Sequence, residues 1–176
     1  MAKDDIYKAI TECMAPPGSL LEKHGENRGY QDCHQLIVPQ ETPTTTKSFA
    51  KSFFASPAFG MERSILWALS FVDKPETSRS YSYGGRFFQL LEETKDGEEI
   101  ILDSGSALTW MRVTPCTGTD CCCYQFGSIV KPHSILVRAL IYPHQLYSKL
   151  LLAGAVRYHQ KQLVKEEDSS TQRSNS

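Results

Sequence analysis

The chain has 176 residues, with 19 basic and 20 acidic side chains and a formal net charge of -1 at neutral pH. That balance excludes the strongly basic surface of a nucleic-acid-binding protein or of a protein held on anionic lipid. Hydrophobic residues make up 40% of the chain, enough for the core of one domain, and the longest apolar runs are shorter than the roughly 20 residues of a bilayer span.

The first residues carry charge and are not followed by an apolar run, so the sequence predicts no secretory signal and a cytoplasmic location. In that compartment we expect the six cysteines to be mostly reduced thiols. No glycine-rich phosphate loop is found, and the sequence therefore indicates no nucleotide cofactor.

Two short helices are expected near the N-terminus. Apolar residues recur at helical spacing between Lys3 and Met14, with acidic residues near the positive end of the helix dipole. Residues 19–24 fit a second helix that ends at Gly25. The polar stretch from there to Lys47 includes a run rich in threonine, and it predicts an exposed arm or linker.

A β-hairpin is the clearest element of the chain. Residues 87–93 form its first arm and residues 99–102 its second, because an Asp-Gly pair between two apolar runs is preferred in turns that need a positive φ. Alternating side chains predict further strands at residues 107–113 and 134–142. Residues 64–72 fit a strand or a helix equally well.

A long helix is expected from Pro143 to Lys165, since proline is tolerated in the first turn of a helix. These elements predict an α+β protein, with a mostly antiparallel sheet of four or five strands, an N-terminal helix and a long C-terminal helix. We divide the chain into an N-terminal helix and polar arm (1–47), one globular domain (48–165) and a Ser-rich disordered tail (166–176).

The hairpin leads directly into the sequence Asp-Ser-Gly-Ser at 103–106, and residues 100–111 read IILDSGSALTWM. This pattern resembles the active-site loop of aspartic proteases, of either the retropepsin-like or the plant nepenthesin-like branch. The resemblance covers about residues 86–124. In that family two such carboxylates share one proton and together activate a water molecule.

The resemblance implies that Asp103 is a catalytic carboxylate, with Ser104 and Gly105 holding it in position. Pepsin-type enzymes carry a second copy of the loop in the same chain, and this chain has only one. The implied enzyme is therefore a homodimeric aspartic endopeptidase to which each chain supplies one Asp103. The other interpretation is structural, because Asp, Ser and Gly are the residues that tight turns favour.

Cysteine and histidine residues after the hairpin raise the question of a zinc site, since structural zinc is held by four such side chains. The candidate ligands are Cys116, Cys121, Cys123 and His133, with Cys33 and His34 able to complete the set. Successive residues of an extended chain face opposite ways, so the three adjacent cysteines at 121–123 cannot all reach one ion. The simpler expectation is a group of thiols without a metal. His144 and His159 are expected to be partly exposed and without a catalytic role.

The function expected from these observations is that of a non-catalytic structural or interaction protein, which acts by self-association or by binding a protein partner. Small virus-encoded matrix and accessory proteins are similar to it in organisation, though not in motif. Leucines surround much of the terminal helix, as is typical of a helix buried in its own core or against a second copy. The alternative function is the homodimeric aspartic peptidase.

Overall fold

The computed structural model of the chain describes residues 7–26, 29–40, 42, 44–60, 88–105, 107–130 and 141–174, with side chains from 146 to 165 in the last range. The element expected at 64–72 and most of the strand expected at 134–142 lie outside these residues.

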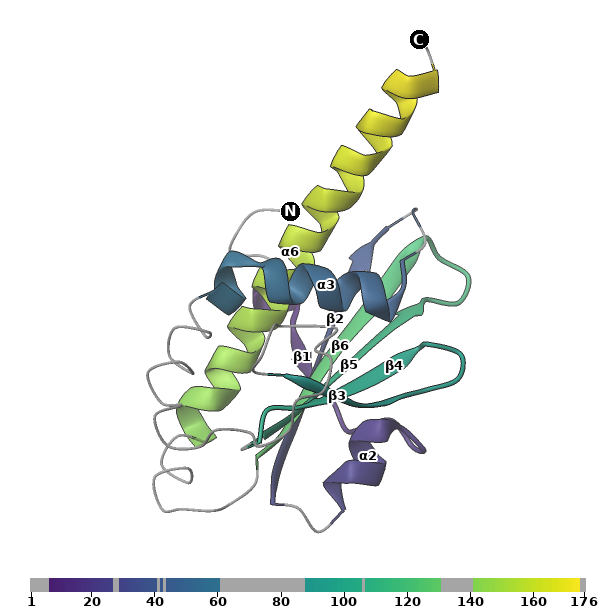
Figure 1. The fold of residues 1–176 in the computed structure, drawn as a ribbon. Coiled ribbons are helices and arrows are strands. Elements are labelled where there is room, and N and C mark those ends of the chain that lie inside the picture. Colours follow the sequence, from purple (N-terminus) through teal and green to yellow (C-terminus); the bar gives the residue numbers. More distant parts are fainter. Residues whose placement is uncertain are drawn as a thin grey trace.

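Six antiparallel strands form one sheet in the order β1-β2-β6-β5-β4-β3 (Figure 1). The strands are β1 (Thr11–Glu12), β2 (Tyr30–Pro39), β3 (Gln89–Glu93), β4 (Glu99–Asp103), β5 (Ala107–Pro115) and β6 (Cys121–Val130). The helices are α2 (Leu20–Gly25), α3 (Thr46–Ala55) and α6 (Ile141–Ser174). The expected α+β class is confirmed, and the described sheet has six strands where four or five were expected.

The sheet separates two hydrophobic clusters, because successive side chains of a strand point to opposite faces. The larger cluster lies under α3 and α6, where Phe53 stacks on Phe126 with ring centroids 5.2 Å apart. The smaller cluster lies on the opposite face under α2 and includes Leu21 and Trp110. Figure 1 shows α3 and α6 on one side of the sheet and α2 on the other.

A buried carboxylate and a glycine hold α2 close to the sheet. Glu99 Oε2 accepts hydrogen bonds from the Leu20 backbone N–H, at 2.8 Å, and from the Trp110 indole N–H, at 2.9 Å. At Gly127, an added Cβ would lie 2.6 Å from Leu21 Cδ2 and 2.9 Å from the Asp32 carbonyl oxygen. Only glycine therefore allows the helix to approach this closely.

Two expectations about the N-terminal region are corrected. The expected helix over 3–14 does not reach its predicted end, because the helical residues stop at Ala9 and Thr11–Glu12 form β1. The polar linker expected from Gly25 to Lys47 is wrong for residues 30–39, which form β2. Leu36 and Val38, which alternate with the exposed Ile37, are buried in the larger cluster. Their burial outweighs the polar residues in the first half of the strand.

The C-terminal helix is longer than the sequence predicted. It begins at Ile141 and continues to Ser174, so residues 166–174 are helical where a disordered tail was expected. The physical reason is that residues 155–174 contain neither proline nor glycine, so nothing breaks a helix that has already formed. None of the described helices is long and apolar enough to cross a membrane.

Candidate functional site

The Asp103 loop is the tight turn of the β4–β5 hairpin. Ser104 donates both its backbone N–H and its hydroxyl to the Ala107 carbonyl oxygen, at 3.0 and 2.9 Å. Asp103 Oδ1 accepts the Gly105 N–H at 2.7 Å. Gly105 has φ of +89°, in the left-handed region that glycine adopts without strain. The loop is therefore a well-formed turn closed by its own side chains.

This geometry favours the structural interpretation of the loop. The Ser104 hydroxyl binds a backbone carbonyl, whereas a catalytic loop of the expected kind uses its hydroxyl to orient the carboxylate. Catalysis by Asp103 stays a prediction.

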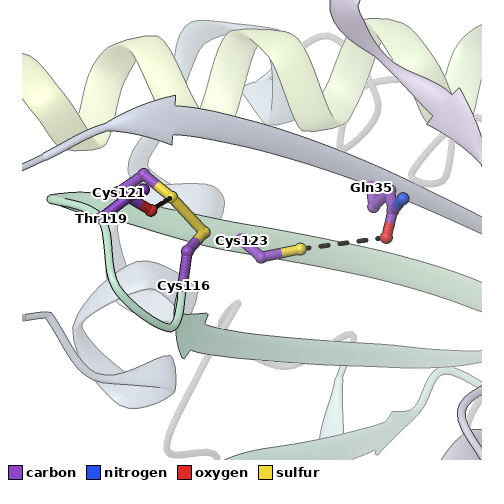
Figure 2. The surroundings of a disulfide bond; sticks show 5 residues. All are labelled: Gln35, Cys116, Thr119, Cys121 and Cys123. Carbon is purple, nitrogen blue, oxygen red and sulfur yellow. Dashed lines mark hydrogen bonds between the residues drawn. A yellow bond between two sulfur atoms is a disulfide. The ribbon is translucent and has the colours of Figure 1, made fainter.

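The cysteines of the predicted zinc set are placed on β6 and on the turn that precedes it. Cys116 and Cys121 form a disulfide across this turn, so neither is a free thiolate (Figure 2). Cys123 points away from the disulfide, toward Gln35 of β2, with its sulfur 3.9 Å from Oε1 (Figure 2). Cys122 faces the larger cluster, which confirms that adjacent cysteines face opposite ways.

A zinc site is not assembled from these residues in the part of the chain that the structure describes. No three metal-binding side chains gather together there. His133 lies outside the described residues. The remaining thiols, at Cys13, Cys33, Cys122 and Cys123, are free.

A cluster of buried polar side chains joins β2, β6 and α6, and the sequence did not reveal it. The Asp32 carboxylate is 4% exposed. Its Oδ1 accepts hydrogen bonds from the Ser128 backbone N–H and hydroxyl, at 2.9 and 2.5 Å, and its Oδ2 accepts one from the Ser148 hydroxyl, at 3.0 Å. His34 lies beside this cluster, with Nε2 3.6 Å from Asp32 Oδ2.

The way in which these serine, aspartate and histidine side chains are hydrogen bonded argues against a nucleophilic site. A catalytic serine must pass its proton to a histidine that a carboxylate orients. Here the serine hydroxyls bond directly to Asp32, and neither ring nitrogen of His34 has a hydrogen-bond partner among the described residues. Ser148 and His34 are at most 1% exposed, so no substrate reaches them. The cluster is a structural connection between the sheet and α6.

His159 forms a second buried polar connection to α6. Its Nδ1 lies 2.9 Å from the Ser52 hydroxyl of α3, and its Nε2 lies 2.7 Å from the Thr44 hydroxyl. Burial lowers the pKa of His159 to about 4, because the charged ring would lose its hydration. The expected partial exposure of this residue is wrong, since its side chain is 1% exposed.

The outward face of α6 carries exposed apolar side chains. Leu146, Leu150 and Val164 are 66%, 40% and 57% exposed. At 100° per residue, these three and the exposed Lys161 fall within a sector of about 60°. We call these four residues the outer stripe. Beyond His159 no described side chain of α6 is buried, and the C-terminal part of the helix projects past the sheet (Figure 1).

Comparisons with known proteins give no relative for this chain. No family model, no curated protein and no solved structure matches it.

Sequence reasoning found the Asp103 turn but missed the Asp32 cluster. A signal was present in the alternation of β2, where Asp32 and His34 share a face with the apolar Leu36 and Val38. Polar residues in phase with a buried face are expected to be hydrogen bonded to one another or to a neighbouring element. The third participant, Ser148, lies more than 100 residues away and has no local signal.

We expect Asp32→Ala to lower the free energy of unfolding by about 3 kcal/mol, because it leaves the Ser128 and Ser148 donors buried without an acceptor. Ser148→Ala should cost about 1.5 kcal/mol. Urea unfolding followed by circular dichroism measures both. Ser48→Ala, at an exposed position of α3, is the matched control and should change stability by less than about 0.5 kcal/mol. Equal effects of Ser148→Ala and Ser48→Ala would contradict the role given to Asp32.

The lowered pKa of His159 predicts a pH-dependent stability. Between pH 6.5 and about 4 the unfolded chain binds a proton at this residue that the folded chain excludes, so this contribution is complete above pH 6.5 and is lost as pH falls toward 4. The loss should reach about 3 kcal/mol. Urea unfolding of the wild type and of His159→Gln is measured across this pH range. The difference between the two profiles gives the contribution of His159, because the carboxylates that also titrate there are common to both proteins. Parallel pH profiles would refute the assignment.

Asp103→Asn distinguishes the two interpretations of the turn. Asparagine keeps the Oδ1 acceptor for the Gly105 N–H, so we expect stability to change by less than about 0.5 kcal/mol, whereas Asp103→Ala should cost about 1 kcal/mol. A peptidase assay with an unstructured substrate accompanies the unfolding measurement. We expect no cleavage by either protein. Cleavage by the wild type that Asp103→Asn abolishes would instead support the aspartic peptidase.

Proposed function

We propose that the protein is a non-catalytic interaction protein that self-associates through the outer stripe of α6. The observation that carries the proposal is the exposure of Leu146 and Leu150, one turn apart on a helix whose opposite side is buried against the sheet and α3. Single exposed leucines are common on protein surfaces. Apolar side chains aligned along one helix face are typical of a surface that packs against a partner.

The length of α6 supports the same conclusion. Its 34 residues span about 50 Å, whereas the ten residues of β2 span about 34 Å. The helix therefore extends beyond the sheet that stabilises it. An isolated helical segment of about 15 residues is marginal in water, and packing against a second helix would stabilise it.

The polar groups of the core also support a structural role. The Asp32 carboxylate, Ser148 and His159 are buried and hydrogen bonded to one another or to neighbouring elements, so they act in stability and not in chemistry. A cytoplasmic location is part of the proposal and is supported by the four cysteines that are free thiols. The Cys116–Cys121 disulfide is the feature that argues against it, since disulfides are rare in a reducing compartment.

A second copy is the partner that we propose, and a two-fold arrangement would place the two outer stripes against each other. Such an interface is self-complementary, because the same patch serves both subunits. Leu146, Leu150 and Val164 would supply its apolar contacts, and the ammonium group of Lys161 can remain hydrated at the end of its flexible side chain.

The test is the mass of the protein in solution. We expect the wild type to sediment as a dimer of the 19.8 kDa chain and the double variant Leu146→Glu/Leu150→Glu to raise the dissociation constant by about 100-fold. Leu91→Glu is the control, since Leu91 on β3 is 45% exposed, close to Leu150, and its substitution should leave the dimer unchanged. Analytical ultracentrifugation over a concentration series measures all three.

Two outcomes would refute the proposal. One is a wild type that remains monomeric across the series. The other is a dimer that Leu91→Glu dissociates and the α6 double variant does not. Unchanged circular dichroism of the variants shows that a loss of association does not come from unfolding.

A further inference from the structure

Cys13 and Cys33 bring two free thiols together at the edge of the sheet. Their sulfur atoms are 3.0 Å apart, and the Cys13 backbone N–H donates to the Cys33 carbonyl oxygen at 3.0 Å. The pairing of β1 with β2 places Thr11 opposite Gln35 and Glu12 opposite His34, so the next position sets Cys13 opposite Cys33. The two cysteines are therefore cross-strand neighbours, although 20 residues separate them in sequence.

This arrangement already satisfies the backbone geometry of a disulfide. Residues directly opposite in an antiparallel pair have Cα atoms about 4.5 to 5.5 Å apart. Disulfides form across Cα separations of about 4.4 to 6.8 Å. A rotation of the two side chains is enough to join the sulfur atoms, and no strand needs to move.

We propose that Cys13 and Cys33 form a reversible disulfide, in which Cys13 reacts first with a small-molecule disulfide and Cys33 then closes the bond. This site is independent of the outer stripe of α6 and goes beyond the proposed function. The co-reactant is a low-molecular-weight disulfide of the oxidised glutathione class.

The two thiols differ in accessibility and acidity in the way that this order of reaction requires. Cys13 is half-buried and so within reach of a small molecule, whereas Cys33 is 3% exposed. The hydrogen bond from Cys33 lowers the pKa of the Cys13 thiol, and that same bond and burial raise the pKa of Cys33. Either thiol can donate while both are neutral. Once one ionises, the charge rests on Cys13, and Cys33 donates to it.

The reaction balances in two exchanges. The Cys13 thiolate attacks one sulfur of the external disulfide, forms a mixed disulfide and releases the other half as a thiolate. That thiolate takes up the Cys33 proton, directly or through solvent. The Cys33 thiolate then attacks the Cys13 sulfur and expels the second half, which is protonated by solvent. Overall, two cysteine thiols are oxidised and one external disulfide is reduced to two thiols.

The bond would fasten a weakly held segment. β1 has only two paired residues and lies at the edge of the sheet, and Tyr7, a few residues earlier, lies under the Arg157 guanidinium of α6 at 5.2 Å. A covalent link at Cys13 would hold this segment against β2. Oxidation would therefore restrain the edge of the sheet without altering its register.

The test is a peptide map of the full chain after equilibration with mixtures of oxidised and reduced glutathione. Trypsin places Cys13 in the peptide 9–23 and Cys33 in the peptide 29–47, while the other four cysteines fall after residue 112. We expect the two peptides to appear joined, with the mass of the chain reduced by two hydrogen atoms. Amide hydrogen exchange at residues 11–13 should slow about tenfold or more in the oxidised protein.

Single substitutions separate the two roles. Cys33→Ala should stop the reaction at a glutathione adduct on Cys13, and Cys13→Ser should leave Cys33 unreacted. Cys123→Ser, a half-buried thiol outside the pair, is the matched control and should still form the 13–33 link. Absence of the joined peptides from the folded wild type, or rapid modification of Cys33 in Cys13→Ser, would overturn the proposal. The wild-type map decides the question even where a variant fails to fold.

Discussion

The buried carboxylate of Asp32 is the interaction on which the arrangement of sheet and long helix depends. A carboxylate without hydration is tolerated only where hydrogen-bond donors replace the water it has lost. Here the donors come from Ser128 on β6 and Ser148 on α6, so one side chain of β2 fixes both neighbours. A slip of β2 by one residue would turn Asp32 to the other face and leave these donors without an acceptor. The polar cluster thus specifies the register that the apolar contacts alone would leave less defined.

The two faces of the sheet have different roles that follow from what covers them. The face under α3 and α6 is packed with aromatic and aliphatic side chains and is closed by the polar connections at Asp32 and His159. The opposite face is covered by α2, which Glu99 and Gly127 hold in close contact. Chemistry-bearing residues on the closed face serve stability, because they are out of reach of a substrate. The surface that we propose for self-association is the outer stripe of α6, whose side chains are exposed.

The cysteines show how strand position changes what a residue can do. Cys122 and Cys123 are adjacent in sequence, yet one is buried under the helices and the other lies on the opposite face beside Gln35. Cys116 and Cys121 are joined across a turn, and Cys13 and Cys33 meet across two strands. The described cysteines, some of which suggest a metal site in the sequence, are therefore dispersed over four places in the fold.

The sequence by itself determined the elements that rest on local patterns. The hairpin from β3 to β5, the helix α2 and the presence of a long terminal helix follow from alternation, from turn residues such as Asp96-Gly97 and from helical spacing. The Asp103 loop was found in the same way, although its sequence is compatible with a catalytic loop as well as with the plain turn that we preferred. The tertiary structure alone decided that β2 and β6 pair at the centre of the sheet, because their polar residues are stabilised by partners far along the chain. The tertiary structure alone brought Ser148 to Asp32 and Cys13 to Cys33. Contacts between residues far apart in the chain produce no local pattern in the sequence from which they could be predicted.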